Sequence, residues 1–229
     1  MLELLNIAPE VANALTNNRP VLALESTVIA YGLPRPENLQ TALRLEAIVR
    51  EGEAVPATIA VLEGQISVGL NDDQITHLAG ENYIEKVSTR DIPVVVARRT
   101  DGVTTLASTI WIAHRAGIQV FATGGIGGVH YGSLPDVSAD LPELARTPII
   151  VVCSGAKIVL DLPPSREWLE THAITVVGYQ CDELPAFYSR GTGLPVDARA
   201  DTPAEVIDIF RAQRSLGIES ALLVGVPVP

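Results

Sequence analysis

The sequence predicts an α/β protein, a three-layer α/β/α sandwich with a largely parallel (mixed) central sheet. Two observations predict this class. Apolar, β-branched runs recur along the chain without polar alternation, which is typical of strands covered on both faces. Segments with helical periodicity separate these runs. Because strand and helix alternate, we expect a ligand site at the carboxyl ends of the strands.

The elements follow in order from an N-terminal amphipathic segment, which predicts a helix ending near Asn17 and does not resemble a secretory signal. The apolar runs predict strands at residues 21–24, 57–62, 93–97, 119–122, 149–153, 174–179 and 221–226. The periodic segments predict helices at residues 38–51, 72–79, 104–116, 165–172 and 203–216, several with a capping residue or proline at the start. A turn at residues 63–65 predicts an antiparallel hairpin.

The length, composition and net charge of the chain limit the kinds of protein and of partner that fit it. The 229 residues, 47% apolar and 19% charged, predict a single domain over residues 1–229. A formal charge of −11 argues against nucleic-acid polymers and anionic membranes, so we expect small molecules or other protein chains as partners. No apolar stretch is long enough to span a membrane, and a soluble, cytoplasmic protein is expected. The two cysteines are expected to be reduced thiols.

Lysine is scarce, because only Lys86 and Lys157 stand among 16 basic residues. Lys157 follows a predicted buried strand by a glycine turn, where low-dielectric surroundings would free its amine for Schiff-base chemistry. Lys86 precedes Arg90 by four residues, which is compatible with an anion-binding cluster. An ordinary surface charge is the alternative for both.

Other chemistry-bearing residues also follow predicted strands. Glu25 ends the first strand, where desolvation would raise its pKa toward that of a proton donor, or it is a satisfied strand-end carboxylate. Residues 123–130 form a glycine-rich run that could cradle an anion or simply make a tight turn. His130 stands where a dinucleotide signature would need its third glycine.

The segment from Asp136 to Asp140 carries two carboxylates and a hydroxyl on alternate positions. Such oxygen ligands suit Mg²⁺ or Mn²⁺ with water or substrate completing the shell, whereas the alternative is a solvated acidic loop or helix start. Residues 102–106 are expected to open a helix, whose free N–H groups favour phosphate.

Together these segments closely resemble the pseudouridine-5'-phosphate glycosidases, also called the indigoidine synthase A-like family. The resemblance covers nearly the whole chain in order. It implies reversible cleavage of pseudouridine 5'-phosphate to uracil and ribose 5-phosphate by a homotrimer that binds Mn²⁺. The blocks that carry the resemblance are ALESTVIAYGLPRPEN, AVPATIAVLEG, KVSTRD, TTLAST, GIQVFATGGIGGVHYG, DVSADLPELA, VVCSGAK and LPAFYSR.

The resemblance also implies roles for the catalytic and phosphate-binding residues. Lys157 matches the nucleophile, which would form an imine with C1 of the ring-opened ribose. Glu25 matches the proton donor. Lys86 matches the substrate-binding lysine, and Leu106 matches the backbone position beside the phosphate.

The remaining matches fall in one segment. Asp136 matches the metal ligand, and His130 matches a histidine that lines the base pocket. Ser138, Ala139 and Asp140 match the substrate-binding Ser-Ala-Asp segment.

The sequence departs from the family at two places. Val226 stands where an Asn-Pro-Ile-Pro motif would begin, and Leu134 and Pro135 lie in a shortened loop before Asp136. We also expect the domain to lack the family's C-terminal helices. Two alternatives remain: another Schiff-base lyase acting on sugar phosphates, and a non-catalytic oligomeric or ligand-binding relative.

Overall fold

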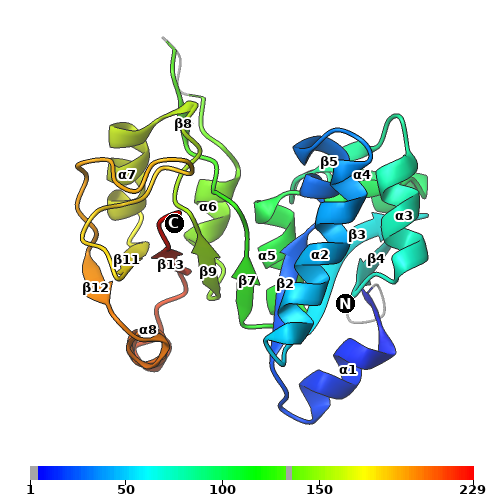
Figure 1. Ribbon diagram of the computed structural model, residues 1–229, viewed down its shortest axis with the longest axis horizontal. Helices are drawn as coiled ribbons and strands as arrows, with labels where there is room; N and C mark the ends of the chain where they lie inside the picture. Colours follow the sequence, from blue (N-terminus) through cyan, green and yellow to red (C-terminus); the bar gives the residue numbers. More distant parts are fainter. Residues whose placement is uncertain (1–4, 133–135) are drawn as a thin grey trace. The chain divides into compact units, whose positions relative to one another are not determined.

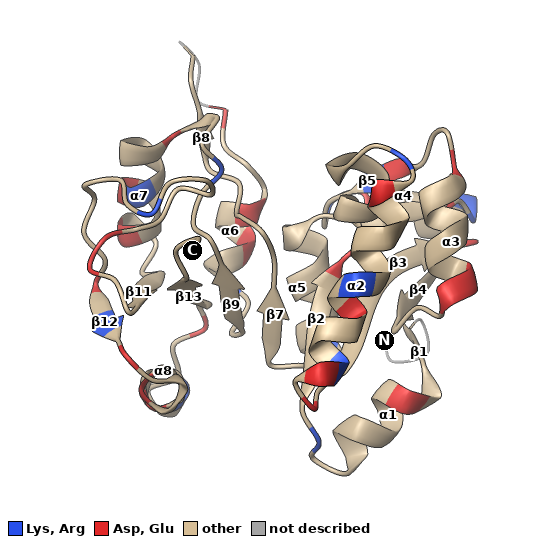
Figure 2. Ribbon diagram, in the orientation of Figure 1, with Lys and Arg blue, Asp and Glu red and all other residues tan. Residues whose placement is uncertain are grey.

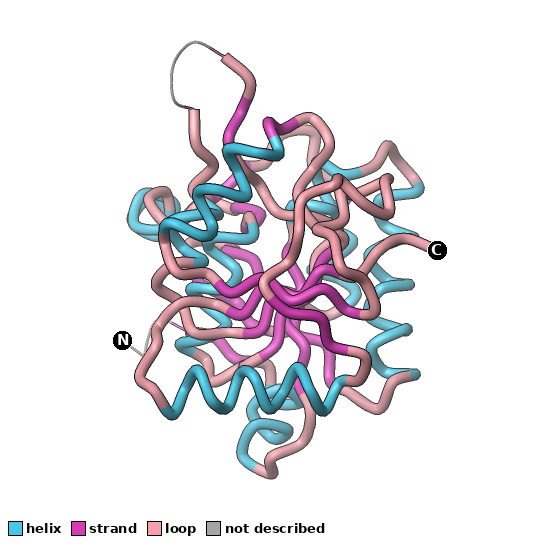
Figure 3. Tube along the Cα trace, turned by 90° about the vertical axis from the view of Figure 1, so that its left-hand side faces the viewer, coloured by secondary structure: helices cyan, strands magenta, loops and turns pink. Residues whose placement is uncertain are grey.

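The computed structural model describes residues 5–132 and 136–229, so the predicted Leu134–Pro135 loop lies outside the described residues. The chain divides into two compact units, unit 1 (Met1–Gln119) and unit 2 (Val120–Pro229). Helices and strands alternate along the chain in both units (Figure 1), and Figure 3 shows helices, strands and loops in separate colours. The strands are mostly parallel with some antiparallel pairs. A single domain over residues 1–229 stays a prediction. Within the described ranges, every helix is too short or too polar to cross a membrane.

Unit 1 is built on a mixed set of strands centred on β3. The order is β1–β4–β3–β2, with β6 also pairing β3 and β5 pairing β6. The strands are β1 (Leu5–Ile7), β2 (Val21–Glu25), β3 (Val55–Leu62), β4 (Gln65–Val68), β5 (Glu85–Val87) and β6 (Gly102–Thr104). The helices are α1 (Pro9–Thr16), α2 (Glu37–Glu51), α3 (Asp72–Gly80), α4 (Ile92–Arg98) and α5 (Leu106–Arg115), with a π-helical turn η2 (Val28–Gly32).

Helices cover both faces of β3, which is why its run is apolar without alternation. Ala60 belongs to a buried cluster with residues of α2 and α3, and Thr58 on the same face donates a hydrogen bond to Glu46 of α2. Ile59 and Val61 point to the opposite face and are fully buried. Helix α5 contacts both β2 and β3 (Figure 1).

Most predicted elements of unit 1 are confirmed. The hairpin is antiparallel, with Leu62 opposite Gln65, and the predicted helices at residues 38–51 and 72–79 are α2 and α3. The expected helix start at Thr104 is wrong, because Thr104 ends β6 and α5 begins at Leu106.

The predicted strand at residues 93–97 is also wrong, because these residues lie in α4. Pro93 occupies the first turn of that helix, a position that proline favours. The buried residues Ile92 and Val95 are three apart, which is helical spacing, while Val94 is exposed. The β-branched run is therefore covered on one side only.

Unit 2 is built on five parallel strands in the order β7–β9–β13–β11–β12. These are β7 (Val120–Ala122), β9 (Ile150–Cys153), β13 (Leu222–Gly225), β11 (Thr175–Tyr179) and β12 (Ala198–Ala200). A separate antiparallel pair joins β8 (Val129–His130) to β10 (Leu160–Asp161). The helices are α6 (Asp140–Leu144), α7 (Leu162–Thr171) and α8 (Pro203–Ser215). Figure 2 shows that β7, β9 and β13 carry no charged residue.

Alternate residues of these strands bury on opposite faces. Ile150, Leu222 and Val224 form a cluster with Val206 and Phe210 of α8. Their neighbours Val151 and Leu223 are also fully buried and point to the other face. Both faces are therefore covered, as the near-continuous apolar runs predicted.

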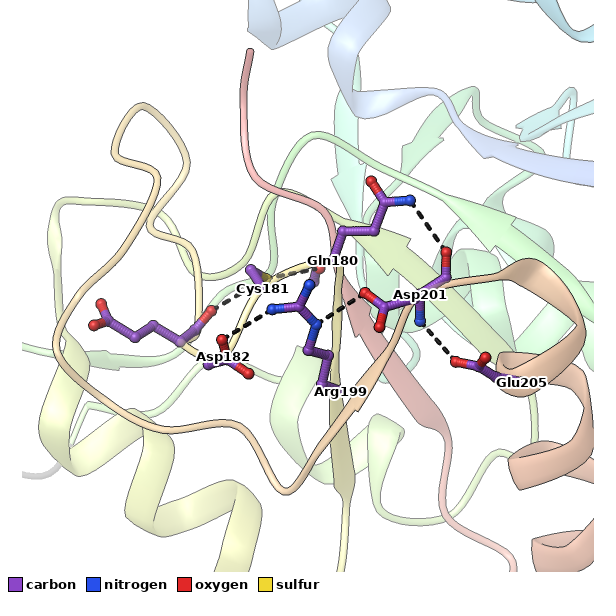
Figure 4. A network of polar contacts seen from close by, with 8 residues as sticks. Gln180, Cys181, Asp182, Arg199, Asp201 and Glu205 are labelled. Atoms are coloured by element: carbon purple, nitrogen blue, oxygen red, sulfur yellow. Dashed lines mark hydrogen bonds and ion pairs between the residues drawn. The ribbon is translucent and has the colours of Figure 1, made fainter.

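The edge strand β12 is fixed by polar contacts rather than by a further strand. Figure 4 shows Arg199 of β12 between two carboxylates, with nitrogen–oxygen distances of 3.0 Å to Asp182 and 2.8 Å to Asp201. The N–H of Asp201 donates to Glu205 at the start of α8. Charged side chains on an edge strand also disfavour pairing with a further strand.

Candidate functional site

In unit 1, Glu25 is the last residue of β2, which pairs with β3. Its register partner is Ile59, and β6 pairs with the next two residues of β3. The neighbouring Ser26 is fully buried and donates to the carbonyl of Ile59 at 2.7 Å, while accepting from the N–H of Thr104 at 2.8 Å. The hydroxyl of Thr27 donates to the Thr104 carbonyl at 2.6 Å. Glu25 is partly buried and its backbone is therefore held firmly to the end of β6.

Lys86 and the start of α5 lie beside that junction. Lys86 is exposed on β5 and is in register with Val103 of β6. The N–H of Thr105, the residue before α5, donates to the Val87 carbonyl at 3.0 Å. Leu106 is buried and begins the helix, whose first N–H groups favour an anion. Unit 1 thus brings its three predicted residues into one region. A cavity of about 490 Å³ in the same unit lies elsewhere, around His77 and Asp101.

In unit 2, Lys157 ends a tight turn that follows β9. The N–H of Ser154 donates to Gly124 at 3.1 Å, and the N–H of Lys157 donates to Ile126 at 3.1 Å. Gly155 between them has φ +82°, and its carbonyl accepts from the N–H of Ile126 at 3.0 Å. Residues 154–157, called here the lysine turn, are therefore bonded to the glycine-rich turn that follows β7.

The lysine side chain itself is exposed. The expected low-dielectric surroundings are not supplied by unit 2 around Lys157. What the fold supplies is a hydrogen-bonded main chain that carries an exposed amine. Among the described residues, Lys157 has no ion-pair partner, so its amine can approach a carbonyl carbon without first breaking an ion pair.

The predicted substrate segment packs directly on the glycine-rich turn. The Asp140 carboxylate is buried and accepts from the N–H of Gly127 at 2.9 Å, and the N–H of Ser138 donates to Gly128 at 2.9 Å. A Cβ at Gly127 would lie 2.2 Å from the Ser138 hydroxyl, so only glycine fits there. Ala139 is exposed and precedes α6, which makes the segment a helix start rather than a solvated loop.

His130 and Asp136 form the more exposed part of this group. Their nearest ring nitrogen and carboxylate oxygen are 3.6 Å apart, with 45% and 76% of the side chains exposed. Among residues 5–132 and 136–229, no three His, Cys, Asp or Glu side chains gather closely enough to enclose a metal ion. Asp136 therefore fits a divalent cation only as a single carboxylate in a shell completed by water or substrate.

The two cysteines are free thiols, as predicted. Burial raises the pKa of Cys153 to about 12, and burial is also the main cause of the raised pKa of Cys181. Since the thiolate is the reactive form, Cys153 is not a nucleophile at neutral pH. Its position beside the lysine turn is structural.

Sequence reasoning did not predict the roles of Ser26, Thr104 and Phe187. Ser26 and Thr104 are 78 residues apart and meet only through strand pairing. Phe187 lies within a segment that carried the family resemblance, and its N–H donates to Ser154 at 2.8 Å. For Ser26 and Thr104, the sequence offered one indication, the position of Ser26 directly after the strand-end Glu25.

Known proteins resemble this chain over most of its length. The family model for indigoidine synthase A-like proteins matches residues 10–229. The pseudouridine-5'-phosphate glycosidase of Hahella chejuensis is 50% identical over 229 residues, covering 98% of this chain and 75% of that protein. The enzyme of the same name from Herpetosiphon aurantiacus is 54% identical over 225 residues, covering 97% and 74%.

Two solved structures share the fold, each covering 98% of this chain and 74% of the other. An indigoidine synthase A-like protein of Thermotoga maritima has a TM-score of 0.91 at 36% identity. The prealnumycin C-glycosynthase AlnA, in complex with ribulose 5-phosphate, has a TM-score of 0.91 at 40% identity. The residue blocks, the fold and the family match point the same way: this chain belongs to the indigoidine synthase A-like family.

Proposed function

We propose that this protein catalyses the reversible cleavage of pseudouridine 5'-phosphate to uracil and ribose 5-phosphate. The observation that carries the proposal is the lysine turn, which fixes the main chain of an exposed Lys157 at the carboxyl end of β9. Relatives at 50–54% identity that are named for this activity support it. The carboxyl end of a parallel strand is where α/β folds carry ligand sites.

The bond to be broken joins carbon to carbon, so protonation of a glycosidic oxygen or nitrogen cannot start the reaction. In the proposed path, the Lys157 amine bonds to C1' as the C1'–O4' bond breaks, and O4' becomes a hydroxyl by taking the proton that the amine gives up. Its nitrogen lone pair then forms an imine as the C1'–C5 bond breaks. The bonding pair passes to C5 of uracil, which takes a proton from Glu25. Water hydrolyses the imine, releasing ribose 5-phosphate and restoring the amine.

The neighbouring structure of AlnA supports an open-chain sugar. A pentulose 5-phosphate has its O5 blocked, so its C2 carbonyl cannot close a furanose ring. A relative at 40% identity in complex with ribulose 5-phosphate therefore shows such an open-chain sugar phosphate with a protein of this fold. Ring opening is the step that the lysine path requires.

Phosphate binding falls to unit 1. The exposed Lys86 supplies positive charge, and the first N–H groups of α5, beginning at Leu106, supply donors. Such a local site holds one phosphate even though the whole chain carries a net charge of −11. We assign base and ribose contacts to His130, Ser138, Ala139 and Asp140, in line with the family resemblance.

Mn²⁺ remains a proposal, with Asp136 as its one carboxylate ligand. A bound Mn²⁺ would polarise sugar oxygens as a Lewis acid. Assembly as a homotrimer is likewise a proposal carried by the resemblance, and a cytoplasmic location stays a proposal as well.

The test is to incubate the protein with pseudouridine 5'-phosphate and Mn²⁺ and to follow uracil release. Uracil formation by the wild type, lost in Lys157→Ala and in Lys157→Arg, supports the proposal, because arginine keeps the charge but cannot form the imine. Turnover of other sugar phosphates without uracil release would indicate a different Schiff-base lyase. No turnover with either would indicate a non-catalytic relative.

A second candidate is formation of a C-glycosidic bond to a different aglycone, favoured by the likeness to a C-glycosynthase. The reverse assay separates the two. Ribose 5-phosphate with uracil should give pseudouridine 5'-phosphate, whereas product formed only with other aromatic acceptors would favour the synthase.

A further inference from the structure

A tight turn lies directly beside the lysine turn. The N–H of Ala186 donates to the Ser189 carbonyl at 2.9 Å, and the N–H of Ser189 donates back at 3.0 Å. Phe187 and Tyr188 are therefore its two central residues. Phe187 has φ +56°, at a turn position where glycine is favoured. A bulky aromatic residue keeps a positive φ only when its surroundings fix it, so the contacts of the Phe187 side chain must account for this backbone conformation.

The Phe187 ring fills the space that two glycines leave. A Cβ at Gly125 would lie 2.6 Å from Cδ2 of the ring, and a Cβ at Gly124 would lie 3.2 Å from Cε2. Both glycines belong to the glycine-rich turn that follows β7. The ring therefore packs on the main chain of that turn at van der Waals distance, and no side chain separates them.

The same residue holds the lysine turn through its main chain. The N–H of Phe187 donates to the Ser154 carbonyl at 2.8 Å, and the N–H of Ser154 donates to Gly124 at 3.1 Å. Gly155 leaves room for the adjoining Pro185, whose carbonyl oxygen would lie 1.7 Å from a Cβ there. Loop 184–189, the glycine-rich turn and the lysine turn are thus locked together in three places.

We propose that Phe187 is a positioning residue for Lys157: its ring sets the glycine-rich turn, and that turn sets both ends of the lysine turn. The inference rests on the proposed function, in which Lys157 must meet C1' of the sugar. Loss of the ring would leave the amine chemically intact but less well placed. Misplacement by about 1 Å can cost a factor of about one hundred in rate.

The test compares three variants under the uracil-release assay. Phe187→Gly removes the ring while suiting the positive φ, and Phe187→Leu restores part of its volume. Leu216→Ala removes an exposed apolar side chain at the end of α8 and serves as the control. We expect kcat to fall about tenfold to a hundredfold in Phe187→Gly, with KM changed by less than about threefold. Phe187→Leu should recover part of kcat, and Leu216→Ala should match the wild type.

Hydrogen exchange provides a measurement that does not depend on turnover. In Phe187→Gly, the amides of Ile126, Ser154 and Lys157 should exchange about tenfold faster, while those of β11 and β13 are unchanged. Wild-type kcat in Phe187→Gly, unchanged exchange, or faster exchange throughout unit 2 would each overturn the inference. If the wild type releases no uracil, the proposed function fails and the exchange pattern alone decides whether Phe187 holds the lysine turn.

Discussion

Gly155 is the position where one added methyl group should do most damage to the lysine turn. Its φ of +82° lies in the left-handed region, which costs alanine about 1 kcal/mol. A Cβ there would also lie 1.7 Å from the carbonyl oxygen of Pro185, and real Cβ contacts stay beyond 3.0 Å. The two backbones must therefore separate by at least 1.3 Å, the difference between those distances.

That separation would break one hydrogen bond across the contact, from Phe187, and the displacement of Gly155 would break a second, from the glycine-rich turn. The N–H of Ile126 donates to Gly155 at 3.0 Å, and the N–H of Phe187 donates to Ser154 at 2.8 Å. At about 1 kcal/mol each, with the backbone term added, Gly155→Ala should lower the free energy of unfolding by about 3 kcal/mol. Gly193→Ala is the matched control, since Gly193 has φ +75° but no atom within 4 Å of its Cβ position. It should lose only about 1 kcal/mol.

Thermal unfolding followed by circular dichroism measures the difference. For a chain of this size, about 1 kcal/mol shifts Tm by about 2–4 °C, so we expect Tm to fall by about 6–12 °C in Gly155→Ala and by about 2–4 °C in Gly193→Ala. Equal losses would show that Pro185 moves aside freely. In that case the close approach of loop 184–189 does not hold the lysine turn.

Three further predictions concern unit 1. The hydrogen bond to Asp101 raises the pKa of His77, so its stabilisation is present below about pH 6.5 and is lost as pH rises through the higher folded value. His77→Gln should flatten the pH dependence of urea unfolding in that range, and an unchanged slope would refute this. Burial raises the pKa of Glu46 even though Thr58 donates to it, so Glu46→Gln should gain stability relative to the wild type as pH rises above about 4.5. Parallel unfolding curves at every pH would count against that. Lys86→Met should raise KM for pseudouridine 5'-phosphate about tenfold or more in initial-rate measurements with little loss of kcat, and an unchanged KM would remove Lys86 from phosphate binding.

Much of the fold could be predicted because both units bury their strands on two faces. The continuous apolar runs at residues 57–62 and 149–153 signalled this directly, and β3 and β9 lie there. The strand prediction at residues 93–97 was wrong because three consecutive valines favour a strand. In the structure this run is buried on one side only and Pro93 lies in the first turn, which are features of a helix. Strand β5 has three residues, too few for any periodic pattern to show.

The sequence could place candidate residues in the fold where they lie at or shortly after the end of an apolar strand. Glu25 is the last residue of β2, and Lys157 follows β9 after residues 154–156, while their roles stay predictions. The contacts that hold them could not be predicted in the same way. Ser26 meets Thr104 through the pairing of β3 with β6, and Phe187 reaches the glycine-rich turn from a loop without regular structure. Such contacts depend on how distant segments pack.

Borohydride trapping of the imine examines the role of Lys157 directly. The chain has two lysines, so peptide mass spectrometry assigns an adduct without ambiguity. Wild-type protein reduced in the presence of ribose 5-phosphate should carry a reduced pentose phosphate on Lys157, and Lys157→Ala should carry none and release no uracil. Full activity in Lys157→Ala, or an adduct found on Lys86 instead, would contradict the lysine mechanism.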